Sequence, residues 1–246
     1  MIPDFKTYIS ESAWGDMRKR STGEIVRKED KVKTNEELRE IIKNLYKEQG
    51  EGDTLDVSSI AFGKKIICDD LSEMFRDYDN VKRIIGLDTW DVSKVTDMSI
   101  MFAYCENLTE LNISNWNVSN VTHMGDMFDH CKNLTELNID NWNVSNVTDM
   151  RFMFYGCKNL TKLNISNWDV SKVTDMRFMF SGCENLTELN IDNWDVSNVT
   201  DIHNMFAHCY NLMKLNIDNW DVSSVTDMDY MFFRCKDLTK KPKWYK

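Results

Sequence analysis

The chain has 246 residues, 42% of them hydrophobic, which suits one large domain or two small ones and excludes a largely disordered protein. Its formal net charge is −10; carboxylates are in excess over residues 51–230, whereas residues 231–246 are basic. An acidic body repels nucleic acid and anionic membrane surfaces, so neither is an expected partner. The apolar runs are too short for a membrane span, and no secretory signal opens the chain. The expected location is therefore cytoplasmic or virion-associated, or the cell surface by a non-standard route.

Residues 1–33 fit neither a repeat nor a cap, and they carry three aromatic residues, Phe5, Tyr8 and Trp14, before a basic run. Such groups commonly find partners, so we expect an attachment segment, with a flexible terminus as the alternative. The segment resembles N-terminal stretches that recur on differing proteins of gut bacteria and their phages.

An amphipathic helix is predicted from Thr34 to Tyr46, within a capping segment of residues 34–50. Thr34 and Glu37 have the spacing of a capping box. Apolar residues at 38, 41, 42 and 45 form one stripe, and Gly50 follows the end. We expect this helix to cover the first repeat of residues 51–246.

Repeats of 26 residues dominate the remaining chain. Trp recurs at 90, 116, 142, 168, 194 and 220, and Cys recurs at 105, 131, 157, 183, 209 and 235. Five complete units run from Trp90 to Asn219, a sixth begins at Trp220, and a degenerate unit precedes them. At the far end, residues 236–246 include Pro242 and several lysines, which discourage addition of another strand, so they form the expected C-terminal cap.

Each unit has two halves with different hydrophobic periods. Residues 108–113 alternate like a short strand, with Leu111 and Ile113 on the buried side. Residues 121–131 place apolar residues at intervals of three and four, which predicts a short helix. Thr148 stands where an N-cap would lie, and Gly156 and Gly182 stand where the chain would leave the helix. The predicted fold is an α/β solenoid of the leucine-rich-repeat type, with parallel strands on the concave side and short helices on the convex side.

The pattern L-x-x-L-x-I-x-N-W followed by V-S-x-V-T-x-M-x-x-M-F-x-x-C resembles the BspA-like leucine-rich repeats of bacterial surface proteins and mycoplasma lipoprotein-type repeats. The resemblance covers about residues 55–240. It implies a curved solenoid used for adhesion or protein binding, often at a cell surface. It implies no catalytic residues.

The sequence has no strong catalytic or metal-binding motif. The cysteines lie on the apolar stripe without paired metal-ligand spacing, so we expect buried, reduced thiols. The four histidines share no ligand spacing, and no phosphate loop or nucleophile motif occurs. Asn115 and its equivalents before each Trp are expected to hydrogen-bond the turn backbone of neighbouring units. We therefore expect no enzyme, no cofactor and no metal.

The outward strand positions are the candidate binding site, since repeat proteins commonly bind on the strand side. They are uniform and polar, which favours an extended or repetitive partner, while mere solubilisation is the alternative. The candidate residues are Glu110, Asn112, Glu136, Asn138, Asp140, Lys162, Asn164, Glu188, Asn190, Asp192, Lys214, Asn216 and Asp218. The predicted function is a non-enzymatic binding module for a protein or an extended polymer. The alternative is a structural accessory of a virion or surface assembly, attached through residues 1–33.

Overall fold

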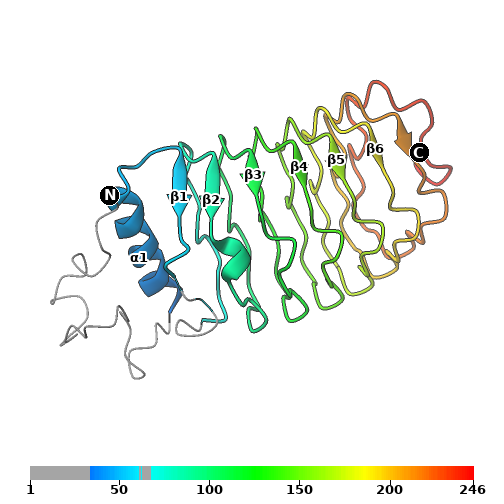
Figure 1. The fold of residues 1–246 in the computed structure, drawn as a ribbon. Coiled ribbons are helices and arrows are strands. Elements are labelled where there is room, and N and C mark those ends of the chain that lie inside the picture. The colour runs from blue at the N-terminus through cyan, green and yellow to red at the C-terminus, as the bar shows by residue number, and fades with distance from the viewer. Residues whose placement is uncertain (1–33, 61, 63–67) are drawn as a thin grey trace, which may run out of the picture.

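The computed structural model describes residues 34–60, 62 and 68–246. Each 26-residue unit makes one coil, and the coils stack into a repeat solenoid with the helix α1 at one end and the C terminus at the other (Figure 1). The predicted attachment segment, residues 1–33, lies outside the described residues.

The helix α1 (Asn35–Glu48) confirms the predicted amphipathic helix. The Thr34 side chain accepts a hydrogen bond from the Glu37 N–H at 3.2 Å, as an N-cap does. Leu38, Ile42 and Leu45 are buried against the first coil. The Asn35 side-chain amide donates to the carbonyl oxygens of Asp70 and Ser72, at 3.2 and 2.8 Å. In the next coil the equivalent carbonyls accept backbone N–H groups, so this side chain substitutes for a missing coil.

Short parallel strands line one side of every coil (Figure 1). They are β1 (Thr54–Asp56), β2 (Arg83–Ile85), β3 (Glu110–Leu111), β4 (Glu136–Leu137), β5 (Lys162–Leu163), β6 (Glu188–Leu189) and β7 (Lys214–Leu215). Pairing is β1–β2–β3, then β4–β5 and β6–β7. The predicted alternation is confirmed, because Leu137 and Ile139 are buried while Glu136 and Asn138 are exposed.

One strand connection requires glycine. After β2 the chain enters the short 3-10 helix η2 (Leu87–Thr89) through Gly86, whose φ is 94°. A Cβ at this position would lie 2.5 Å from the backbone nitrogen of Ser58. Only glycine combines that left-handed conformation with such a close approach.

The predicted convex helices are wrong: within the described repeats, the Met–Phe segments form turns joined between coils. The N–H groups of Met98 and Ile100 donate to carbonyls of the next coil, at 3.0 and 2.9 Å. From Met98 to Met101 the chain forms a tight turn, in which the N–H of Met101 donates to the Met98 carbonyl at 3.4 Å. The backbone reaches φ of 60° at Ile100, which an α-helix does not contain.

Backbone hydrogen bonding between coils explains the error. A parallel bridge links successive coils at the head of each turn segment, in the order Asp70, Asp97, His123, Asp149, Asp175, Asp201 and Asp227. Thr148 does not cap a helix; its hydroxyl donates to the Thr122 carbonyl of the preceding coil at 3.2 Å. Gly156 and Gly182 do have positive φ, at 68° and 77°, but inside the turn segment and not after a helix. The spacing of buried residues is compatible with the predicted helix and with the observed turns.

The core consists of side-chain columns that run the length of the stack. The rings of Phe128, Phe154 and Phe180 are fully buried and stack with centroids 5.6 Å apart. Trp142 stacks on Trp116 at 6.5 Å, and its indole N–H donates to the Ile113 carbonyl at 3.2 Å. These columns bury the apolar faces that a single unit could not cover.

The final coil is closed by the C-terminal segment. Trp244 stacks on Trp220 at 6.4 Å, and its indole N–H donates to the Ile217 carbonyl at 2.9 Å. Tyr245 packs edge-on against Phe232, with centroids 5.0 Å apart. Trp244 follows Trp220 by 24 residues instead of 26, yet it occupies the next place in the Trp column.

Candidate binding surface

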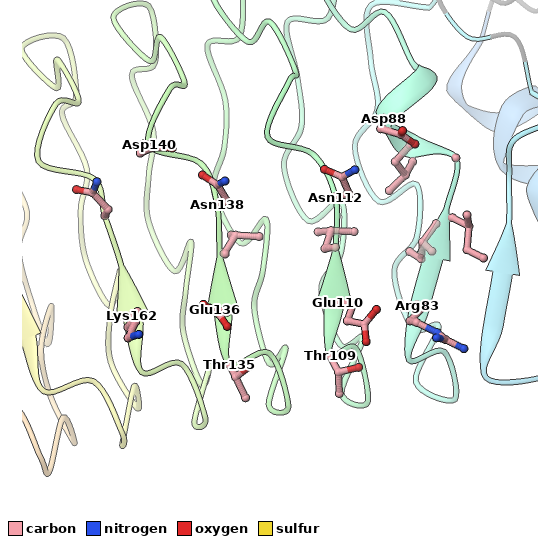
Figure 2. Close-up of a pocket in the computed structure, with 17 residues that line it drawn as sticks. Arg83, Asp88, Thr109, Glu110, Asn112, Thr135, Glu136, Asn138, Asp140 and Lys162 are labelled. Carbon is pink, nitrogen blue, oxygen red and sulfur yellow. The ribbon is translucent and has the colours of Figure 1, made fainter.

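The outward side of the strands is hollowed into a groove over β2 to β5 (Figure 2). Its volume is about 960 Å³. Seven of the thirteen candidate residues line it: Glu110, Asn112, Glu136, Asn138, Asp140, Lys162 and Asn164. The other six belong to the continuation of this face over β6 and β7. We call the whole surface the strand face.

Charged side chains form one row across the strand face. Pairing places Arg83 beside Glu110, and Glu136 beside Lys162 (Figure 2). Further along, the ammonium group of Lys214 lies 3.2 Å from the Glu188 carboxylate. Opposite charges on neighbouring strands screen one another, so this row has little net charge of its own.

Asparagine side chains form the second row, at Asn112, Asn138, Asn164, Asn190 and Asn216. All five are exposed. The hydroxyl groups of Ser114 and Ser166 donate to the Asn112 and Asn164 side-chain oxygens, at 3.3 and 3.1 Å. These bonds fix both amides with their NH₂ groups available as donors. Because adjacent strands lie about 4.8 Å apart, the row repeats a polar group at that interval.

The third row is less uniform than the sequence suggests. Asp140 and Asp218 are half-buried, whereas Asp192 is exposed. Asp218 accepts hydrogen bonds from the Lys240 ammonium at 2.9 Å and the Lys243 backbone N–H at 3.0 Å. These contacts lower the pKa of Asp218 below its ordinary value, the Lys240 hydrogen bond most strongly. Asp218 thus holds the C-terminal segment in place and is not free for a ligand.

Sequence reasoning missed several residues of the groove. Arg83, Asp88, Thr109 and Thr135 line it (Figure 2), and Ile85 adds an apolar side chain that is 48% exposed. Arg83, Asp88 and Ile85 belong to the degenerate unit, where the repeat pattern is hard to align. Thr109 and Thr135 directly precede the candidate residues Glu110 and Glu136. Their recurrence at the same place in successive units could have indicated that they share this surface.

The cysteines lie beneath the opposite side of the coils. Cys105, Cys131, Cys157, Cys183 and Cys209 are fully buried and unbridged, whereas Cys235 is half-buried. Each of the five donates to the carbonyl of a core Phe in the preceding coil, such as Cys131 to Phe102 at 3.2 Å. Burial raises the pKa of the Cys105 thiol to about 12. A thiol without thiolate character neither binds a metal nor reacts readily, so the column is structural.

Other structural observations bear on the remaining expectations. Of the column before each Trp, only Asn115 makes the expected bond in the described coils, to the Asp88 carbonyl at 2.8 Å. Histidine, cysteine and carboxylate side chains of the described residues form no group of three that could hold a metal ion. In the same part of the chain, no helix is both long and apolar enough to cross a membrane.

Comparison with known proteins gives one family match. A model described as "Mycoplasma protein of unknown function, DUF285" matches residues 69–163 and 157–246. No curated protein is similar enough to match.

Solved structures give distant likenesses to repeat proteins. A leucine-rich repeat protein from Bacteroides ovatus is 18% identical, with a TM-score of 0.37, over 66% of this chain and 45% of that one. A functional domain of InlJ from Listeria monocytogenes, which includes a cysteine ladder, is 16% identical with a TM-score of 0.21, over 76% and 43%. A leucine-rich cell surface protein from Faecalibacterium prausnitzii is 15% identical with a TM-score of 0.21, over 76% and 75%. The chain thus spans less than half of the first two.

The two family matches together run from residue 69 to residue 246, which takes in β2 to β7, the turn segments and the Trp column. They confirm the resemblance to mycoplasma-type BspA-like repeats that the Trp, Val-Ser, Met-Phe and Cys positions carry. The chain belongs to the DUF285 family of mycoplasma-type repeat proteins.

Proposed function

We propose that this protein is a non-enzymatic binding module, which holds a protein or an extended polymer along its strand face. The observation that carries the proposal is the groove of about 960 Å³, because ordered rows of polar side chains line it. Asn112, Asn138 and Asn164 present amide donors at a fixed interval, which suits a partner that itself repeats carbonyl or hydroxyl groups. An adhesion-type role follows from the same surface if the partner is a polymer at another cell.

The charged row of the strand face favours a partner that is held by hydrogen bonds rather than by net electrostatic attraction. The row from Arg83 to Lys214 alternates in sign over most of its length, so this row contributes little long-range steering. Ile85 offers an apolar anchor at the first end of the groove. Binding therefore depends on many weak polar contacts made at once, which a long repetitive partner can provide.

The test is capture of peptides and glycans on arrays by the full chain and by a strand-face variant. The variant carries Glu110→Lys, Glu136→Lys and Glu188→Lys, which reverses three exposed charges without touching the core. A matched control carries Glu40→Lys, Glu48→Lys and Asp237→Lys, three exposed carboxylates far from the groove. We expect the strand-face variant alone to lose capture, while both variants melt like the parent.

Capture that survives in the strand-face variant would move the site to another surface. The alternative role, a structural accessory attached through residues 1–33, has no support from the family match, which begins at residue 69.

A further inference from the structure

A band of aromatic rings crosses the side of the coils opposite the strands, outside the core. We call this surface, formed by residues 97–106, 123–132, 149–158, 175–184, 201–210 and 227–236, the turn face. Phe152 and Phe178 stack with centroids 4.7 Å apart, and Tyr155 lies edge-on to both at 5.5 and 6.0 Å. His203 continues the band, 5.2 Å from Phe178 and 6.1 Å from Tyr230. The rings of Phe152 and Phe178 are half-buried, and Tyr230 is 61% exposed.

The fold does not require aromatic residues at these positions. The places of Phe152 and Phe178 are held in other coils by Ile100, Asp126 and Asn204. All five have φ between 53° and 60°, so the backbone is the same whichever side chain is present. Asparagine and aspartate tolerate that left-handed conformation better than phenylalanine does. The backbone conformation therefore gives no reason for a ring here, whereas aromatic residues are enriched where proteins bind one another.

Carboxylates accompany the rings. The bridging positions of the turn face are aspartate in five of its six segments. Before the ring pair in the stack, Asp126 is half-buried, and Asp129 is buried and hydrogen-bonded to His130. Beside Tyr230, Asp227 and Asp229 are exposed. Arg151 and Arg177 are already paired with aspartates, at 3.1 Å to Asp149 and 3.3 Å to Asp175. The turn face thus combines aromatic rings with an excess of negative charge.

The chain itself places cations on rings of this face. The Arg234 guanidinium lies 5.2 Å from the ring centroid of Phe233, and the Lys236 ammonium lies 5.3 Å from that of Tyr210. Both distances are within the range of a cation–π interaction. Phe152, Phe178 and Tyr230 have no such cation over them among the described residues.

We propose that the turn face is a second interaction surface, which docks an arginine-containing, cationic segment of a partner protein. Guanidinium groups stack flat on the rings of Phe152, Phe178 and Tyr230 and pair with the neighbouring carboxylates. Arginine suits this surface better than lysine, because its planar group stacks on a ring and still donates hydrogen bonds to a carboxylate. This surface is separate from the groove proposed above.

The test measures binding of a ten-arginine peptide and a ten-lysine peptide to the full chain by titration calorimetry. The variant carries Phe152→Asn and Phe178→Asn, which gives both coils the residue that Asn204 already supplies in the same conformation. We expect the parent to bind the arginine peptide more tightly than the lysine peptide. We expect the variant to bind the arginine peptide about fivefold or more weakly, with an unchanged melting temperature.

The strand-face variant with Glu110→Lys, Glu136→Lys and Glu188→Lys is the control for attraction by overall charge. It lowers the net negative charge but leaves the rings in place, so it should keep the preference for arginine. The proposal is overturned if the asparagine variant binds the arginine peptide as tightly as the parent. Equal binding of the two peptides by the parent overturns it as well.

Discussion

The strand face and the turn face are built by the same repeats, yet they differ in what the repeats preserve. On the strand face, the outward asparagine recurs unchanged from Asn112 to Asn216. On the turn face, the place of Phe152 is held by isoleucine, aspartate, asparagine or tyrosine in other coils. Both faces are hydrogen-bonded between coils through the backbone, so neither depends on its outward side chains for the fold. The comparison teaches that uniform and variable surfaces can share one scaffold, and that each suits a different kind of partner.

Removing a core ring beneath the turn face should have the largest effect. Phe154 is fully buried between Phe128 and Phe180, so Phe154→Ala should lower the free energy of unfolding by roughly 3–5 kcal/mol. Phe152→Ala, two residues away on the outside, is the control and should cost much less. Urea denaturation measures both. Similar losses in the two variants would contradict the assignment of inside and outside.

A smaller effect is expected from the turn backbone. Gly182 has φ of 77°, and a Cβ there would lie 3.3 Å from the Gly156 Cα. Gly182→Ala should therefore destabilise by about 1–2 kcal/mol. Gly125 has no positive φ, and its added Cβ would meet the flexible Arg151 side chain at 3.4 Å. Gly125→Ala should be neutral or slightly stabilising, and a loss equal to that of Gly182→Ala would show that φ is not the cause.

Titration of the turn face gives the third prediction. Burial and, next, the Asp129 carboxylate raise the pKa of Asp126 from 3.8 to about 6. The protonated form is favoured by folding, so this group stabilises the fold below about pH 4 and that contribution is lost as the pH rises past 6. Asp126→Asn should raise stability at pH 8 by about 1 kcal/mol after allowance for solvent screening, but not at pH 4. Thermal melting at the two pH values checks this, and an equal gain at both would exclude the carboxylate as the cause.

The strand face should show the smallest effect. Asn164 is exposed, and its side-chain oxygen accepts from a neighbouring serine on the surface. Asn164→Ala should change the free energy of unfolding by less than about 0.5 kcal/mol. A loss above 1 kcal/mol in urea denaturation would mean that the asparagine row supports the fold, which would weaken its interpretation as a ligand surface.

The sequence predicts the repeat length, the buried columns and the strand side correctly, because each is repeated six times and chance agreement becomes negligible. It mispredicts the turn segments because buried residues such as Met98, Met101, Phe102 and Cys105 have the spacing of a helical stripe. What separates a helix from these turns is hydrogen bonding between coils, as from Ile100 to the Gly125 carbonyl. That interaction exists only in the stack, so no local pattern reveals it.

The groove was predicted in part, since seven of its lining residues were chosen from the alternation of strand residues. Arg83 and Asp88 were missed because the degenerate unit hides their place in the stack. The aromatic band was missed for a different reason. Phe152 and Phe178 occupy a position that varies between units, whereas the repeat pattern is defined by the residues that recur.

The way in which Trp244 covers the last coil bears on how the number of repeats can change in such proteins. The Trp244 indole provides at the C-terminal end the ring and the hydrogen bond that every inner coil receives from its successor, and it stacks on Trp220 of the last coil. At the other end, the Asn35 side chain of α1 bonds to the carbonyls of Asp70 and Ser72 in the first coil. Near-identical units between the two ends can therefore be duplicated or deleted by recombination, and each product would still fold with both ends covered. Length is then an evolutionary variable that changes the reach of the molecule without new terminal structures.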